Sequence, residues 1–109
     1  MWTVAGGPDY AGKPRPAVIL QDDAFDATGS ITICPVSSYL VDAPLVRLPI
    51  DPSDQNGLRV PSQLMVDKIT TVSKTKCETC VGRLSDEDLI RVSRAVLVFL
   101  GLAGPSAKT

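Results

Sequence analysis

An arginine between two prolines is the residue of this chain whose type and setting most favour chemistry. Arg15 lies between Pro14 and Pro16, at the start of an apolar run of strand length. The prolines fix the neighbouring φ angles, so the guanidinium projects from a stiff base. A planar cation with five N–H donors can hold two phosphate oxygens and stabilise the charge that develops during in-line attack. The competing interpretation is a solvent-facing arginine at the start of a strand.

The chain contains no histidine. Histidine is the commonest general acid or base near neutral pH, so Ser-His-Asp, Cys-His and histidine–zinc mechanisms are excluded. Cys77 and Cys80 have the spacing of zinc ligands, but zinc needs two more ligands and Cys34 supplies only one. We therefore expect no metal and no other cofactor, and we interpret the pair as ordinary thiols beside the last helix, with a redox role as the alternative.

Length and charge limit the classes of function. At 109 residues the chain forms one domain, residues 1–109. Its net charge of −1 argues against binding duplex nucleic acid by bulk electrostatics. The charges are unevenly distributed, with four cations and eight acids in residues 9–67 but six cations and four acids in residues 68–94. A local cationic surface on an acidic body is therefore compatible with the sequence.

The sequence shows no sign of a membrane or secretory protein. No apolar run approaches the ~20 residues that span a bilayer. Residues 1–7 lack the basic start and long apolar stretch of a signal peptide. The odd number of cysteines does not suggest a disulfide framework. We expect a cytoplasmic protein without a membrane partner.

Short apolar runs separated by glycine, proline and aspartate predict a mainly β fold. The C-terminal stretch alone has helical periodicity, with Ser85 as N-cap and Gly101 as the stop. We expect residues 1–84 to form a small barrel and residues 85–101 a C-terminal helix, an α+β arrangement. The last turns of that helix are apolar nearly all round, which favours burial between two subunits. The expected strands are residues 2–5, 16–21, 30–36 and 45–50, with one or two more within 63–72.

Four blocks of the chain resemble the MazF/PemK family of toxins, in the family's order and spacing. The resemblance covers nearly the whole chain. The blocks are Lys13-Pro14-Arg15-Pro16-Ala17-Val18-Ile19-Leu20-Gln21-Asp22-Asp23, then Ile31-Thr32-Ile33-Cys34-Pro35-Val36-Ser37-Ser38, the segment from Gly57 to Val72, and Gly82-Arg83-Leu84-Ser85.

The resemblance implies an SH3-like barrel of the CcdB/PemK type and a homodimer. It also implies metal-independent, sequence-specific cleavage of single-stranded RNA, in which a ribose 2′-hydroxyl attacks the neighbouring phosphate. The products would be a cyclic phosphate and a free 5′-hydroxyl end. A cognate antitoxin with a disordered, acidic segment would lie across the RNA site.

The family pattern assigns the catalytic residues to Arg15 and Ser37. Ser37 stands where the family usually has threonine or serine, and its hydroxyl would hydrogen-bond a non-bridging oxygen or relay a proton; a serine satisfied by a turn is the competing interpretation. The Gly6–Pro14 loop would be a flap, with Tyr10 available to stack on a base, or else a plain linker. Residues expected to order RNA through amide, carboxylate, hydroxyl or ammonium groups are Lys13, Gln21, Ser38, Ser62, Gln63, Asp67 and Lys68.

Two other functions remain open on the sequence. A CcdB-like toxin shares the fold but poisons DNA gyrase by contact and has no catalytic site. An inactive SH3-like module would only bind its antitoxin and DNA. The Arg15–Pro16 strand and Ser37 favour the enzyme.

Overall fold

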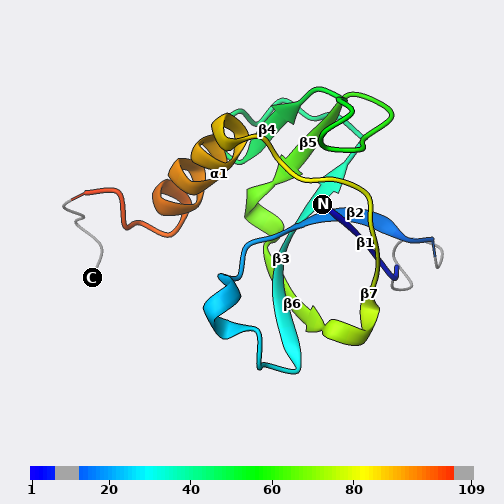
Figure 1. Cartoon of the computed structure of the whole chain (residues 1–109). Helices are drawn as coiled ribbons and strands as arrows, with labels where there is room; N and C mark the ends of the chain where they lie inside the picture. Colours follow the sequence, from blue (N-terminus) through cyan, green and yellow to red (C-terminus); the bar gives the residue numbers. More distant parts are fainter. Residues whose placement is uncertain (7–12, 105–109) are drawn as a thin grey trace.

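The computed structural model describes residues 1–6 and 13–104 (Figure 1). Within these residues, seven short strands precede one α-helix, so the expected α+β order is confirmed. The elements are β1 (Trp2–Val4), β2 (Arg15–Ile19), η2 (Asp23–Phe25), β3 (Ser30–Ser37), β4 (Arg47–Ile50), β5 (Ser62–Met65), η3 (Val66–Lys68), β6 (Thr70–Ser73), η4 (Lys74–Lys76), β7 (Cys77–Cys80) and α1 (Asp86–Phe99); the η elements are single 3₁₀ turns.

β3 is the strand around which the antiparallel sheet is built. It pairs with β2 along one edge. Along its other edge it pairs first with β6 and then, past a bend, with β5, which in turn pairs with β4. β1 pairs with both β2 and β7, and η4 joins β7 to β6. The path from β7 through β1, β2 and β3 to β6 therefore curls into a nearly closed ring, which Figure 1 shows below α1.

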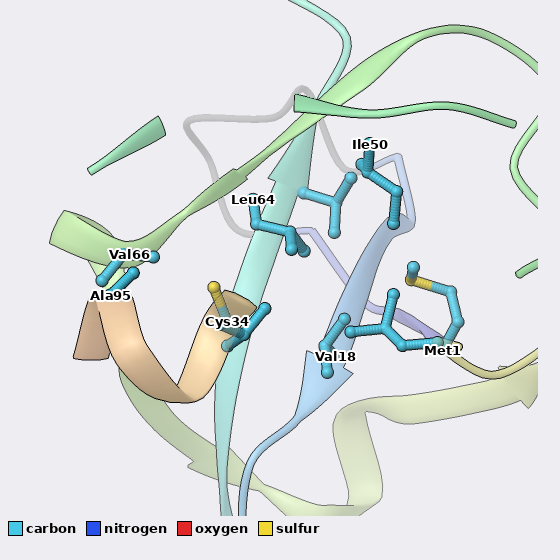
Figure 2. Close-up of a cluster of buried hydrophobic side chains, with 10 residues drawn as sticks. Met1, Val18, Cys34, Ile50, Leu64, Val66 and Ala95 are labelled. Atoms are coloured by element: carbon cyan, nitrogen blue, oxygen red, sulfur yellow. The ribbon is translucent and has the colours of Figure 1, made fainter. Parts of the chain in front are cut away.

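β2 and β3 bury side chains on both of their faces. Successive residues of a strand point to opposite faces, and here Ala17 and Val18 enter different apolar clusters, as do Ile33 and Cys34. The smaller cluster fills the ring with Val4, Ala17, Ile31 and Ile33. The larger cluster packs the sheet against α1 (Figure 2), and its buried residues are Met1, Val18, Cys34, Val36, Ile50, Leu64, Val66, Leu84, Val92 and Ala95.

α1 has the N-cap and the glycine stop that the sequence predicts, although it ends at Phe99, two residues before the expected end. The Ser85 hydroxyl accepts the N–H of Asp88 at 3.1 Å, which satisfies a donor of the first turn. Gly101 has a φ of 74°. The Leu102 N–H donates to the carbonyl of Leu97 and the Gly101 N–H to that of Val98, the two bonds of a Schellman motif. No helix in residues 1–6 and 13–104 is long and apolar enough to cross a membrane.

β7 is the strand that the sequence analysis missed. Its residues Cys77-Glu78-Thr79-Cys80 are mostly exposed, so no alternation of apolar residues marks it. The stretch 63–72 forms two strands separated by η3, and β4 begins two residues later than expected. Most of the expected Gly6–Pro14 flap, with Tyr10, lies outside the described residues.

Gly57 is a position where the fold depends on glycine. Its φ is 74°, and a Cβ there would overlap the backbone carbonyl of Val81. A left-handed conformation costs a residue with a side chain about 1–2 kcal/mol before any overlap is counted. Gly57→Ala should therefore lower the free energy of unfolding in urea by at least about 2 kcal/mol.

Gly29 offers the matched control, because a Cβ there would meet no atom within 4 Å. Gly29→Ala should stay within about 1 kcal/mol of the parent chain. Equal stability of the two variants would contradict the described packing of Gly57 against Val81.

Candidate functional site

A pocket of about 290 Å³ opens beside the ring, where β1, β2 and β3 meet the η4 turn. Apolar side chains of the ring cluster, among them Val4, Ala17 and Ile33, form part of its lining. Polar side chains come from four separate segments of the chain. They are Arg15, Ser37, Ser38, Tyr39, Thr70 and Lys76.

The pairing of β2 with β3 explains why Arg15 and Ser37 line the same pocket. Ala17 lies opposite Pro35, and Ile19 lies opposite Ile33. When this register is continued by two residues, Arg15 falls opposite Ser37. Side chains of directly opposed residues share a face of the sheet, and this is the face on which Ala17 and Ile33 fill the ring. The two residues singled out from the sequence thus reach one cavity from adjacent strands.

Among the residues that the structure describes, the charged ones that line the pocket are cations. Arg15 and Lys76 line it, and no aspartate or glutamate is among its described lining residues. Lys76 belongs to η4, and its backbone carbonyl accepts the N–H of Ala5 at 2.8 Å, which ties this turn to the end of β1. Such a lining suits an anion with several oxygen atoms. The sequence analysis did not single out Lys76, Thr70 or Tyr39; only the excess of cations after residue 67 pointed in this direction.

Ser37 ends β3 and takes part in a tight turn. Its Oγ accepts the backbone N–H of Tyr39 at 3.0 Å. A hydroxyl group has one hydrogen to donate besides its acceptor sites. The turn therefore occupies an acceptor site of Ser37 and orients the hydroxyl, while its hydrogen is suited to donation. The turn expected from the sequence as the competing interpretation is therefore present, and the catalytic role of Ser37 stays a prediction.

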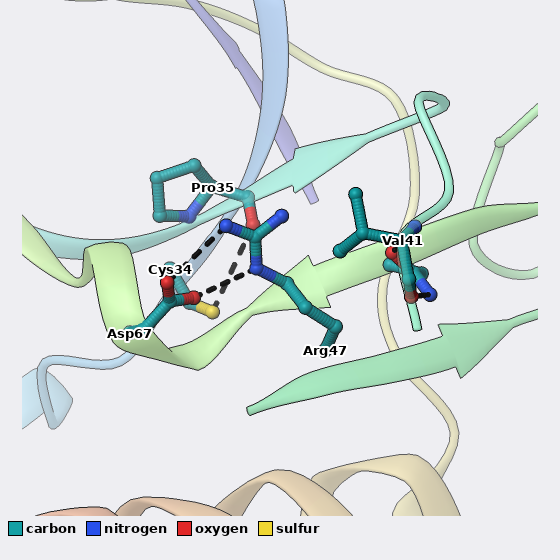
Figure 3. A network of polar contacts seen from close by, with 6 residues as sticks. Cys34, Pro35, Val41, Arg47 and Asp67 are labelled. Carbon is teal, nitrogen blue, oxygen red and sulfur yellow. Dashed lines mark hydrogen bonds and ion pairs between the residues drawn. The ribbon is translucent and has the colours of Figure 1, made fainter. Parts of the chain in front are cut away.

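Asp67 is held by an arginine outside the pocket lining (Figure 3). The guanidinium of Arg47 donates to both carboxylate oxygens, from Nε at 2.8 Å and from Nη2 at 3.2 Å. This hydrogen bonding lowers the pKa of Asp67 below its ordinary value and raises the pKa of Arg47. A carboxylate with a lowered pKa is a weak base near neutral pH. The pair joins the start of β4 to η3.

Other residues expected to contact RNA use their polar groups within the chain. The amide of Gln21 donates to the Phe25 carbonyl and the Thr28 hydroxyl, and the Ser62 hydroxyl donates to the carbonyl of Val60. Gln63 is buried, and its amide bonds the backbone of Val41. Lys13 and Lys68 are exposed but are not among the pocket's lining residues, whereas Ser38 is.

The three thiols are free. Cys34 is fully buried in the larger cluster, and burial raises its pKa to about 12, which makes it unreactive. Cys77 and Cys80 lie on β7, opposite Val4 and Trp2 of β1. In the part of the chain that the structure describes, no three or more histidine, cysteine or acidic side chains gather as they do around a metal ion.

Comparison with known proteins gives a consistent result. A family model described as "PemK-like, MazF-like toxin of type II toxin-antitoxin system" matches residues 1–100. The chain is 49% identical over 104 residues to the "Probable endoribonuclease MazF" of Mycolicibacterium smegmatis, and the match covers 95% of each chain.

Solved structures share the fold at low sequence identity. The toxin MazF-mt6 of Mycobacterium tuberculosis superposes with a TM-score of 0.76 at 20% identity, covering 94% of this chain and 98% of the other. An "Endoribonuclease in complex with its cognate antitoxin from Mycobacterial species" also gives 0.76, at 18% identity and 95% coverage of both chains. A chain of the MazE–MazF crystal structure (Form-II) from Deinococcus radiodurans gives a TM-score of 0.69 at 20% identity, covering 93% of this chain and 92% of the other.

Proposed function

The chain belongs to the PemK-like, MazF-like toxins of type II toxin–antitoxin systems, and from this premise we propose that it is an endoribonuclease that cuts single-stranded RNA in the pocket of Arg15 and Ser37. The relative from M. smegmatis carries the name of a probable endoribonuclease. The observation that carries the proposal is the pocket lining itself. Two cations and several hydroxyls converge there, and the lining residues that the structure describes include no carboxylate, a lining that favours a phosphodiester.

The proposed reaction is an internal transfer at phosphorus. The ribose 2′-oxygen forms a bond to the adjacent phosphorus, and the bond to the 5′-oxygen of the next nucleotide breaks. One proton leaves the 2′-hydroxyl and one proton, exchanged through solvent, reaches the departing 5′-oxygen. The products are a 2′,3′-cyclic phosphate and a 5′-hydroxyl end.

Each polar group has a part in this scheme. The guanidinium of Arg15 holds the non-bridging oxygens and stabilises the charge that grows on them in the transition state. Ser37, whose Oγ already accepts a backbone N–H, donates its hydrogen to one of the same oxygens. Lys76 of η4 also binds the phosphate, and Ser38 lines the same pocket. The RNA-binding roles predicted for Lys13 and Lys68 would apply to nucleotides beyond the pocket.

The gyrase-binding alternative is not favoured. A CcdB-like toxin needs no anion pocket, and the family match and the relative's name both point to MazF. A cytoplasmic location is part of the proposal, because that is where a bacterial toxin meets its RNA.

The first test removes the guanidinium. Purified protein incubated with a long RNA in EDTA should cut it, and Arg15→Ala should lower kcat by about 10²–10³, the usual cost of losing a donor to a developing oxyanion. Arg59→Ala is the matched control, because it removes an exposed arginine that does not line the pocket, and it should cut like the parent chain. Intact RNA with the parent chain, or equal losses in the two variants, would contradict the proposal.

The proposed assembly is a homodimer that a cognate antitoxin inhibits. Several apolar side chains of α1 and its end are exposed, including Ile90, Val98 and Phe99 at 52%, 55% and 47%. A surface of this kind favours burial against a second copy. An acidic, disordered antitoxin segment would be drawn to the cationic side chains of Arg15 and Lys76 in the pocket.

Light scattering combined with the RNA cleavage assay tests both assignments. The protein alone should have twice the mass of the 11.6 kDa chain. Adding the antitoxin should give a larger species that no longer cuts RNA. A monomer would contradict the dimer, and a complex that still cuts RNA would contradict the placement of the antitoxin segment.

A further inference from the structure

Tyr39 is an aromatic residue on the pocket rim that the phosphate chemistry does not use. Its side chain is 78% exposed, so burial of its ring contributes little to the fold. It follows Ser37 and Ser38 directly and lines the same pocket. An exposed ring beside a phosphate site is a surface on which a nucleobase can stack, because every base has an aromatic face.

The backbone next to Tyr39 is held in place by side-chain hydrogen bonds. The Tyr39 N–H donates to the Oγ of Ser37 at 3.0 Å, so the position of the ring is linked to that of the proposed catalytic hydroxyl. Two residues later, Val41 is held on both of its backbone groups by Gln63. Its N–H donates to Oε1 at 3.0 Å, and its carbonyl accepts Nε2 at 2.8 Å.

Gln63 is well placed to act as a clamp. It lies on β5 opposite Ser37 of β3, so it is itself fixed by the sheet. Only 7% of its surface is exposed, and both of its amide atoms bind Val41, which leaves it poorly placed to read RNA. Gln63 thus holds the connection between β3 and β4 at Val41, two residues after Tyr39 of the pocket lining.

We propose that the Tyr39 ring stacks on the nucleobase next to the scissile phosphate and that Gln63 is a positioning residue that fixes the ring through Val41. This proposal rests on the proposed function and adds a base-binding subsite to it. In this proposal Gln63 does not contact RNA directly, as the sequence analysis expected, but positions the Tyr39 side chain through Val41. The ligand of the subsite is a single unpaired base, held by its face and not by its edge.

The test begins by mapping the cut site of the parent chain on a long transcript and making a short RNA that contains it. With this RNA, Tyr39→Ala should raise KM about 5- to 150-fold, the usual range for loss of one stacked base, with kcat changed far less. Tyr39→Phe keeps the ring and should behave like the parent chain. Phe25→Ala is the matched control, because it removes another exposed aromatic, 62% exposed, that does not line the pocket.

A modified substrate identifies the stacked base. Two RNAs that lack the base on one or the other side of the cut should be compared with the parent and the Tyr39→Ala protein. On one of them the two proteins should show the same KM, because the partner of the ring is gone. An unchanged KM for Tyr39→Ala on the complete RNA, or an undiminished difference on both modified RNAs, would overturn the subsite.

The positioning role of Gln63 has its own readout. Gln63→Met, and Gln63→Asn with an amide one methylene shorter, should raise KM like Tyr39→Ala. Neither should add to the effect when combined with Tyr39→Ala, because Gln63 acts through the ring. Additive effects would overturn the positioning role, and the Tyr39 measurements hold even if a Gln63 variant does not fold. Absence of cutting by the parent chain would contradict the nuclease itself, whereas normal cutting by Tyr39→Ala contradicts only the subsite.

Discussion

The register between β2 and β3 is the constraint on which the rest of this structure depends. It sets Ala17 opposite Pro35 and thereby directs one face of both strands into the ring and the other face toward α1. A slip of one residue would exchange the two faces of a strand. It would bring Val18 into the place of Ala17 and move Arg15 away from the pocket side. The same register that packs two apolar clusters therefore delivers a guanidinium and a hydroxyl to one cavity.

The parts of the site differ in how firmly the fold holds them. Arg15 and Ser37 lie at the ends of β2 and β3, within two residues of the buried Ala17 and Val36. Lys76 is exposed, but the backbone of its turn is tied to Ala5. Tyr39 lies on a connection anchored by side chains, those of Ser37 and Gln63. The proposed phosphate-binding groups thus lie on stiff elements and the proposed base-binding group on a tethered loop, which suits an enzyme that must cut one linkage but admit a flexible strand.

The features that could be predicted from the sequence are those whose determinants lie close to them along the chain. Arg15 was identified from its flanking prolines and Ser37 from a family pattern, and the ends of α1 followed from Ser85 and Gly101, because each signal lies within a few residues of its effect. Long-range pairing was not accessible. Nothing near Lys76 or Thr70 shows that β6 returns to β3 or that η4 meets β1. Gln63 was expected to contact RNA, because an amide in a sequence does not reveal that the backbone of the distant Val41 binds it. The amide of Gln21 instead bonds the turn that follows it in the chain, at Phe25 and Thr28.

The most direct test of the account is a crystal structure of the protein with an RNA that carries 2′-deoxyribose at the cut site, which can bind but cannot react. The account predicts that a single phosphate will lie within hydrogen-bond distance of both the Arg15 guanidinium and the Ser37 hydroxyl, with Lys76 facing it across the pocket. An RNA bound elsewhere on the chain, or a phosphate that contacts Arg15 while Ser37 remains turned away, would contradict it.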